Sequence, residues 1–414
     1  MNEPRPLAPR ARQEALRAAV GRRREQLIEL TAELVRRRTV LGAEELGQSL
    51  VAEQLTASDF AVTRIEPDAS QALADPYAGY PALPYAGRSS VVGKLPGTGG
   101  GRSLHLSGHV DVVPVDPADD WTCDPWGGVV ADGRLWGRGA GDMKGGLAAY
   151  LVAAAAIAEV CDDLRGDLVV SSVIEEECGG NGMWSVVNAG HNGDATLIGE
   201  PSGLQMMHAG TGVVWARLRV AGASGHSAAA GRTGSFEELA AAVAAVRDVE
   251  AELNQAAAQS VFGSASDWPF GMTVGQIEGG VWTSSVPAEL TARVRLGFGL
   301  DHDPATIQAK IRAAVCQASP ETQVRFEAFR ARAWCGDASG PFPDLLAAAH
   351  QSVLARELRP GVFTATNDGR YVTGPCLCYG PIAGNYHGKD EWVDIESLEQ
   401  TAAVVAAAAA SWLA

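Results

Sequence analysis

Two short segments of the chain combine a histidine with carboxylates in a pattern that could bind a metal ion. His109 and Asp111 lie two residues apart at the end of an apolar, strand-like segment, residues 103–113, so both side chains are expected on one face. An imidazole that binds a metal through one ring nitrogen usually donates its other N–H to a carboxylate, and Asp111 could accept it. Asp142 follows in a glycine-rich loop, where small residues allow other ligands to approach closely.

Further carboxylates and a histidine follow other predicted strands. Three consecutive glutamates, residues 175–177, come directly after the apolar strand 167–174, where an unpaired carboxylate is destabilised by desolvation. Glu200 follows a short buried strand, and His387 lies in a loop after the strand 376–379. Histidines and carboxylates without a thiolate ligand favour catalytic zinc or a similar divalent metal over a structural zinc–thiolate site. Five ligands are too many for one open zinc ion, whereas two metals that share a carboxylate would use them all.

Composition limits the class of protein. The 414 residues exceed the usual size of one domain, so two domains are expected. A formal charge of −16, from 33 basic and 49 acidic residues, argues against binding to nucleic acid. The seven cysteines form no C-x-x-C pair and are odd in number, which favours a reduced compartment over a disulfide framework. No apolar signal segment is visible and the apolar runs are shorter than the roughly 20 residues that span a bilayer, so we expect a cytoplasmic protein without a membrane partner.

The order of the predicted elements indicates an α/β domain that is interrupted by an insertion. In the first part we expect helices and strands in alternation: helices at 12–37, 44–58 and 145–160, a loop at 67–87, and strands at 89–95, 103–113, 167–174 and 196–198. From about residue 212 the order becomes β-α-β-β-α, at 213–220, 236–254, 272–277, 290–299 and 304–318. After the insertion we expect helices and strands in alternation again, with a helix at 345–358, the strand 376–379 and a helix at 395–413. The predicted domains are therefore residues 1–210 with 333–414, which carry the metal ligands, and residues 211–332.

Five ordered motifs resemble those of one family. HVDVVP at 109–114 and GRGAGDMKGG at 137–146 resemble the first two signatures of the co-catalytic zinc metallohydrolases, which include acetylornithine deacetylase, succinyl-diaminopimelate desuccinylase, aminoacylase and glutamate carboxypeptidase. GEPS at 199–202, GHSA at 225–228 and the N-x-H-G-x-D-E motif at 385–391 are similar to further motifs of that family. The resemblance covers nearly the whole chain from about residue 12. It is greatest to the acetylornithine deacetylase-like deacylases.

The resemblance implies a fold and a metal site. The fold would be α/β, with a zinc-exopeptidase-like catalytic domain, a mixed sheet flanked by helices, and an inserted two-layer α+β domain that serves as dimerisation and lid domain. Asp142 would bridge two divalent metal ions, zinc in the first place, with cobalt or manganese as alternatives. The other ligands would be His109 and Glu200 for one metal, and Glu177 and His387 for the other. Glu176 matches the family's general base, and Asp111 matches the carboxylate that orients His109.

The resemblance also assigns roles in the insertion. His226 would reach the active site of a partner subunit and stabilise the tetrahedral oxyanion, which implies a homodimer formed through the inserted domain. Arg295 is the candidate for binding a carboxylate of the substrate. Ser285 stands where many members have an asparagine just before the Val-Pro of the lid, so the contacts of that asparagine are not expected to carry over.

The predicted activity is hydrolysis of a small, amino-acid-like substrate at an N-acyl amide of acetyl, succinyl or formyl type, or at a peptide bond, through a water that bridges the metals. A dipeptidase or carboxypeptidase on the same site is the alternative, because these classes share the metal centre and differ in what lines the lid. A non-catalytic binding protein would lack a ligand or the base, and none is missing. A serine hydrolase is disfavoured because no G-x-S-x-G segment occurs.

Overall fold

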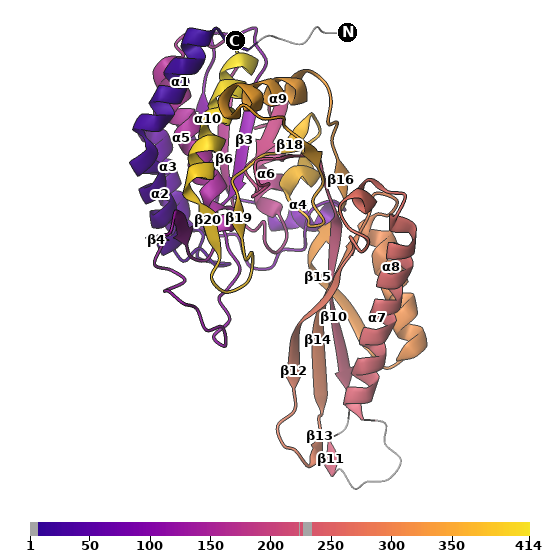
Figure 1. Ribbon diagram of the computed structural model, residues 1–414. Coiled ribbons are helices and arrows are strands. Elements are labelled where there is room, and N and C mark those ends of the chain that lie inside the picture. The colour runs from indigo at the N-terminus through magenta and orange to yellow at the C-terminus, as the bar shows by residue number, and fades with distance from the viewer. Residues whose placement is uncertain (1–6, 223, 227–233) are drawn as a thin grey trace.

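The computed structural model describes residues 7–222, 224–226 and 234–414. Figure 1 shows a larger domain, formed by the N-terminal and C-terminal parts of the chain, from which a narrower domain extends. We call the narrower part the lid. The C-terminus lies on the larger domain, at the end of the molecule that is farthest from the tip of the lid.

The larger domain is built on an eight-stranded mixed sheet with the order β1-β2-β6-β3-β7-β18-β8-β17. The strands are β1 (Ala61–Ile65), β2 (Ser90–Leu95), β3 (Leu104–His109), β6 (Leu168–Val173), β7 (Ala195–Ile198), β8 (Met206–Met207), β17 (Pro360–Gly361) and β18 (Cys376–Cys378). β3 pairs in parallel with β6 and β7, and β18 pairs in parallel with β7. The carboxyl ends of these four strands therefore meet at one edge of the sheet, where α/β proteins place their sites.

Helices cover both faces of this sheet. On β6, Val170 packs in the cluster that contains α5 (Gly145–Val160), whereas Val169 packs with α6 (Asn181–Asn188) on the other face. Alternation along a strand places such neighbours on opposite faces, and every residue of β3 and β6 is buried. This burial on both faces fits the sequences of the two strands, LHLSGH and LVVSSV, which contain no charged carboxylate, lysine or arginine on either face.

One helical segment, Ala140–Val160, is long and apolar enough to cross a membrane by length and composition, with 21 residues and a mean hydropathy of 1.4. In the structure, 78% of its apolar window is buried inside the protein. It includes α5, which packs against α10 (Ile395–Trp412) and against the sheet. The apolar composition is therefore explained by a core helix.

Most predicted helices are present, but the single helix expected at residues 12–37 is wrong. Two helices, α1 (Arg10–Arg22) and α2 (Arg24–Arg36), meet at Arg23, whose φ of −97° and ψ of 9° leave the helical region. Gly21 lowers helix propensity at this junction, and the break lets Val20 and Leu27 enter the same core. The remaining helices of the domain are α3 (Glu45–Ala57), α9 (Pro341–Leu354) and a short α4 (Ala69–Ala74) within the segment expected to be a loop.

A second, four-stranded sheet lies beside the loops that carry Asp142 and His387, and it was not predicted from the sequence. Its order is β19-β20-β5-β4, with β4 (Val129–Ala131), β5 (Arg134–Trp136), β19 (Ala383–Gly384) and β20 (Trp392–Asp394). The pairing of β5 with β20 brings the loop after residue 136 next to the loop 385–391. Two motifs that are 250 residues apart in the sequence are thereby neighbours.

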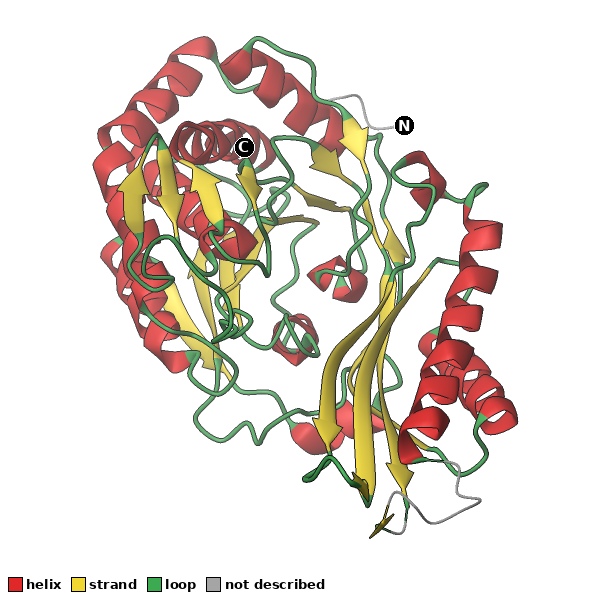
Figure 2. Ribbon diagram, turned by 60° about the horizontal axis from the view of Figure 1, so that its bottom comes forward, coloured by secondary structure: helices red, strands yellow, loops and turns green. Residues whose placement is uncertain are grey.

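The lid is a two-layer α+β unit, as predicted, and its main sheet has one strand more than expected. Its sheet has the order β12-β14-β10-β15. The elements are β10 (Gly212–Ala221), α7 (Ser235–Ala257), β12 (Met272–Gly279), β14 (Glu289–Phe298), α8 (Pro304–Ala318) and the missed β15 (Gln323–Ala331). Figure 2 shows both helices on one face of this sheet, while the other face is directed toward the larger domain. At the tip, β11 (Gly225–His226) pairs with β13 (Ser285–Val286).

The two crossings of the chain between larger domain and lid lie side by side. β9 (Ala209–Gly210) pairs antiparallel with β16 (Trp334–Cys335). The lid sheet begins at Gly212 and ends at Ala331, directly beyond these strands. We therefore propose that residues 211–332 form one domain, and residues 1–210 with 333–414 the other.

Candidate metal centre and its cleft

Asp142 lies between two histidines that are far apart in the sequence. Its Oδ1 is 3.1 Å from Nε2 of His109, and its Oδ2 is 3.4 Å from Nε2 of His387. Each carboxylate oxygen thus faces a different imidazole. This is the arrangement expected for a carboxylate shared by two metal ions.

The fold explains why these side chains meet. His109 ends β3, and the turn that carries Glu177 follows β6, so both lie at the carboxyl edge of the sheet. Asp142 lies just before α5, whose Gly146 packs against the backbone that precedes Glu200. A Cβ at Gly146 would lie 1.8 Å from the carbonyl oxygen of residue 199, so only glycine permits this approach.

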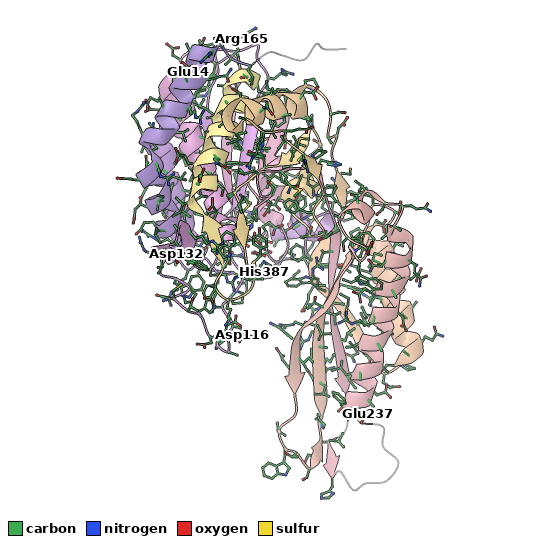
Figure 3. The ribbon with its side chains drawn as sticks, viewed as in Figure 1. Glu14, Asp116, Asp132, Arg165, Glu237 and His387 are labelled. Carbon is green, nitrogen blue, oxygen red and sulfur yellow. The ribbon has the colours of Figure 1, made fainter. Side chains whose placement is uncertain are left out.

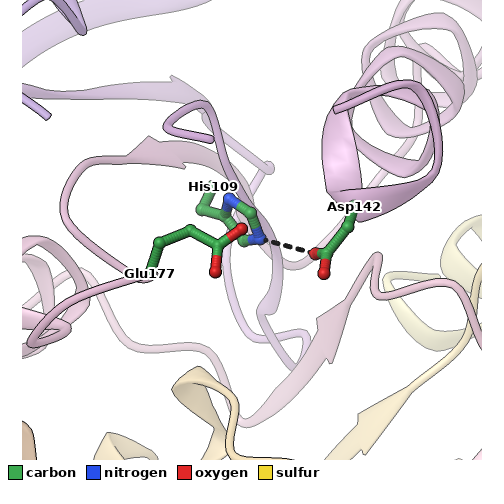
Figure 4. Close-up of side chains that lie close together, drawn as sticks. All are labelled: His109, Asp142 and Glu177. Atoms are coloured by element: carbon green, nitrogen blue, oxygen red, sulfur yellow. Dashed lines mark hydrogen bonds and ion pairs between the residues drawn. The ribbon is translucent and has the colours of Figure 1, made fainter. Parts of the chain in front are cut away.

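Glu177 completes a group of donors. One donor atom each of His109, Asp142 and Glu177 lie within 4.8 Å of one another, and Figure 4 shows the three side chains converging. Oε2 of Glu177 is 3.1 Å from Nε2 of His387. Oε1 of Glu177 is buried and has no hydrogen-bond partner among the described residues. A buried, unpaired carboxylate oxygen beside two imidazoles fits a bound divalent cation.

Glu200 lies in the same cleft but outside this tightest group. It is 8% exposed and lines a cavity of about 410 Å³ together with Asp142, Glu177 and His387. Burial, and then the neighbouring Asp142 carboxylate, raise the pKa of Glu200 well above its ordinary value. All five predicted ligands therefore border one site.

The site concentrates negative charge in a buried place. Burial and the Asp142 carboxylate raise the pKa of Glu177 to about 7. The Glu177 carboxylate in turn raises the pKa of His387 to about 11, and Asp142 acts in the same direction. A cation placed between these side chains would be stabilised by their negative charge, as is expected of a metal site.

Asp111 differs from its predicted geometry. Because β3 ends at His109, Asp111 lies beyond the strand, and Nδ1 of His109 is 2.9 Å from the backbone oxygen of Asp111. The Asp111 carboxylate lies farther from Nδ1, at 3.8 Å. It accepts instead the backbone N–H groups of Glu176 and Glu177, at 3.1 and 3.0 Å. Asp111 therefore orients the imidazole through its main chain and the glutamate turn through its side chain.

Glu176, the predicted general base, is 5% exposed and borders the cavity. Its Oε1 accepts a hydrogen bond from Nη1 of Arg370 at 3.2 Å. Arg370 is itself buried, and its guanidinium lies over the ring of Phe329 at 5.4 Å. The sequence did not predict that Arg370 holds the base.

Glu391 is a second residue whose role was not predicted from the sequence. Its carboxylate accepts the backbone N–H groups of Gly139, Gly141 and Asp142, each at 3.0 Å, and Nη1 of Arg138 at 2.6 Å. Glu391 is 1% exposed. One buried carboxylate thus fixes the loop that presents Asp142. The sequence signal that could have indicated this role is the position of Glu391 at the end of the 385–391 motif, which also contains His387.

The lid forms the opposite wall of the cavity. Trp215 and Phe329 pack edge to face, 5.1 Å between ring centroids, and line the cavity with Arg295. Nη1 of Arg295 donates to the carbonyl oxygen of Gly271 at 3.0 Å. Burial lowers the pKa of Arg295, and no carboxylate forms an ion pair with it in the described chain. A buried arginine beside the ligands is suited to hold an anionic group of a substrate.

His226 is not brought to this site. It lies on β11, at the tip of the lid, which Figure 1 shows at the far end of the molecule from the larger domain. His226 is exposed there. The GHSA motif continues into residues 227 and 228, which lie outside the described residues.

Two imidazoles and three carboxylates at the carboxyl edge of a mixed sheet, with a buried base beside them, define a metallohydrolase. Residues 105–411 match the family described as Peptidase family M20/M25/M40, and the chain belongs to this family. A succinyl-diaminopimelate desuccinylase from Rhodospirillum centenum is 30% identical over 327 residues, 76% of this chain and 82% of that protein. An N-formyl-4-amino-5-aminomethyl-2-methylpyrimidine deformylase from Bacillus subtilis is 28% identical over 361 residues, 79% of this chain and 84% of that protein.

Solved structures share the fold. The di-peptidase Dug1p from Saccharomyces cerevisiae has a TM-score of 0.78 at 14% identity, covering 97% of this chain and 98% of that chain. The YXEP protein from Bacillus subtilis, described as a dinuclear metal binding peptidase, has a TM-score of 0.60 at 14% identity, covering 95% and 99%. The chain is thus a metallohydrolase that acts on linear amides, N-acyl amides or peptide bonds. The predicted family, fold class and type of reaction are confirmed.

Proposed function

We propose that the chain is a deacylase that removes an acyl group from the nitrogen of a small amino-acid-like substrate. The observation that carries this proposal is the position of Asp142, with one oxygen directed at His109 and the other at His387. His109, Asp142, Glu177, Glu200 and His387 would hold two divalent cations, zinc in the first place and cobalt or manganese as alternatives. When bound, such cations polarise the amide carbonyl and lower the pKa of a water molecule.

The chain's own residues would move the proton and orient the reactants. Glu176 takes a proton from the attacking water and passes it to the leaving amine, as a general base and then a general acid. Arg370 fixes one oxygen of Glu176, and the Asp111 carboxylate fixes the backbone of the same turn. Trp215 and Phe329 exclude water from one wall of the cavity, and Arg295 binds an anionic group of the substrate.

A deacylase is favoured over a dipeptidase or carboxypeptidase by the degree of similarity. The desuccinylase and the deformylase share 30% and 28% identity with this chain. The di-peptidase shares the fold at 14%. Both groups use one type of site, so an assay must separate them. N-acetyl-ornithine, N-succinyl-diaminopimelate, N-formyl amines and a few dipeptides, compared by kcat/KM, would show which bond is cleaved best, and highest values for dipeptides would contradict the proposal.

The role of Glu176 is tested by Glu176→Gln on the best substrate of that panel. The variant keeps the shape of the side chain, so the bound metal per chain should stay as in the wild type. Activity should fall by about 10³-fold, because general-base catalysis typically contributes 10²–10⁴-fold. Retention of most of the activity would show that another group takes the proton.

Three further roles belong to this proposal. The protein would act in the cytoplasm and as a homodimer that associates through the lid. His226, exposed at the tip of one lid, would enter the partner's active site and stabilise the oxyanion. The edge strand β12 supports such pairing, since residues Gln276–Gly279 are exposed and leave backbone groups free for another strand.

A further inference from the structure

The face of the lid sheet opposite α7 and α8 carries a run of arginines. Arg217 on β10 has Arg293 on β14 and Arg325 on β15 as its direct cross-strand neighbours. Arg295 lies two residues from Arg293 on the same strand, so it points to the same face. We call these four residues the arginine stripe.

The arginine stripe is poorly neutralised within the chain. Glu327 pairs with Arg293, with Nε and Oε1 2.9 Å apart. Among the described residues, Arg217 and Arg325 form no ion pair, and Nε of Arg217 is buried without a hydrogen-bond partner. The next carboxylates toward the tip are Glu278 and Glu289. Glu289 is paired with Arg219 at 2.6 Å, and Arg217 interacts with it only at longer range.

Repulsion among these arginines destabilises the sheet of the lid unless an anion is bound. Like charges directly opposite each other on one face of a sheet destabilise the pairing, and Arg217 has an arginine on both sides. The chain as a whole has 49 acidic and only 33 basic residues, so the local excess runs against its composition. An anion placed over Arg217 would relieve the repulsion and satisfy the buried N–H.

The stripe leads away from the metal centre along one cleft. Arg295 lines the cavity of about 410 Å³ that contains the metal ligands. A second cavity, of about 830 Å³, is lined by Arg293, Arg295, Arg325 and also by His387. The two cavities share Trp215, Arg295 and His387, so a ligand that reaches from the metals along the lid would pass from Arg295 to Arg293 and Arg325. Arg217 does not line either cavity, but it lies between Arg293 and Arg325 on the neighbouring strand.

We propose that the arginine stripe binds a second carboxylate of the substrate, at the end remote from the scissile amide. The inference rests on the proposed function, which it narrows to acyl amino acids that carry two carboxylates. Arg295 would hold the carboxylate nearer the metals and Arg325 the remote one, with Arg217 adding positive charge beside Arg325. Two residues along a strand span about 7 Å, so several bonds should separate the two carboxylates.

The test measures binding of two simple carboxylates to the metal-loaded protein by calorimetry. Pimelate carries two carboxylates separated by a chain, and hexanoate carries one. The wild type should bind pimelate about tenfold more tightly, because the second carboxylate gains hydrogen bonds to a charged group that solvent only partly screens. Arg217→Gln and Arg325→Gln should each reduce that preference at least threefold, and added salt should reduce it in the wild type.

The matched control is Arg165→Gln, which removes one positive charge from the far end of the larger domain, where Figure 3 labels Arg165. It should keep the wild-type preference. Equal binding of pimelate and hexanoate, tighter binding of phenyl phosphate than of pimelate, or equal loss in all three variants would overturn the inference. A changed monomer–dimer ratio with unchanged preference would also overturn it, because the stripe would then be a subunit interface.

A kinetic comparison separates this inference from the proposed function. An N-acyl amide with a remote carboxylate is compared with the same amide whose remote carboxylate is replaced by a carboxamide. If the wild type hydrolyses both with the same KM, the deacylase stands and the second carboxylate site is wrong. If neither is hydrolysed while the pimelate preference depends on Arg217 and Arg325, the anion site stands and the proposed reaction is wrong.

Discussion

The metal centre and the lid face that lies opposite it are organised in contrary ways. Around the metal centre, the carboxylates of Asp111, Glu176 and Glu391 are held by groups of the larger domain, Glu391 by three backbone N–H groups and Arg138. On the lid, Arg217 and Arg325 have no ion-pair partner among the described residues, and the tip exposes 73% of Trp282. The carboxylates of the larger domain are positioned within a single chain. Arg217 and Arg325 of the lid face lack ion-pair partners in the described chain, which a substrate or a second subunit would have to supply.

This difference separates two kinds of residue. Groups fixed by their own domain can be assigned a role from one chain, since their geometry is already set. Groups on the lid face acquire a role only with substrate or with a second subunit, which supply the missing charge or contact. Substitutions in the larger domain should therefore act on every substrate, and those in the lid should depend on substrate or on partner.

The largest effect is expected for Asp142→Asn, which breaks the shared ligand. Asparagine offers one oxygen in place of two, so it cannot face both His109 and His387 with an acceptor. Bound metal should fall below that of the wild type, and activity should drop by at least about 10³-fold on every substrate. The control is Asp132→Asn, in the exposed turn between β4 and β5, which Figure 3 labels. Wild-type metal content in the Asp142 variant would show that this carboxylate is not a ligand.

A smaller effect is expected for Glu391→Gln, which alters the support of the Asp142 loop without replacing a candidate ligand side chain. The glutamine amide group would face backbone N–H groups that need an acceptor, so the loop should shift. Residues that orient a ligand typically contribute 10–100-fold to metal affinity, and we expect a loss within about that range. Added metal should restore much of the activity, which a merely unfolded variant would not show. Glu237→Gln, on an exposed lid position, should match the wild type.

The sequence indicated the five candidate metal ligands because they occur in short motifs, most of them at the ends of predicted strands. It could not show the contacts that support them, since Glu391 and Asp142 approach only when β5 pairs with β20. Those strands have three residues each and give no periodic signal. β15 was missed for a different reason: it has nine residues, but its alternation is interrupted where the pairing with β10 shifts register between Val214 and Trp215. Without this strand, the cross-strand contact of Arg325 with Arg217 could not be predicted. Local patterns predict elements, whereas pairing between short strands is decided by the whole fold.

The assignment of His226 to a partner's site predicts complementation between two defective proteins. Glu176→Gln and His226→Ala subunits should each be inactive or weak alone. After mixing, half of the dimers should be mixed under random exchange, and each would hold one intact site of two, so activity should approach about a quarter of the wild type per chain. Mixed dimers that form, as shown by tagged subunits in sedimentation, but stay inactive would place His226 outside the active site.

The smallest effect concerns pH and again distinguishes the two regions. The larger domain buries His105 and His350, and burial lowers the pKa of His105 to about 3 and that of His350 to about 4. Between pH 6.5 and those values the unfolded chain binds protons that the folded chain does not, so the free energy of unfolding falls as the pH decreases. Each histidine contributes at most about 1.4 kcal/mol per pH unit.

In the metal-chelated protein, His350→Phe should reduce the loss of melting temperature between pH 6.5 and 4.5, whereas His302→Phe, in the turn before α8 of the lid, should leave it unchanged. An equal pH slope in wild type and His350→Phe would mean that His350 is protonated in the folded state and that its contact with the hydroxyl of Tyr379, at 2.9 Å, persists when it is charged.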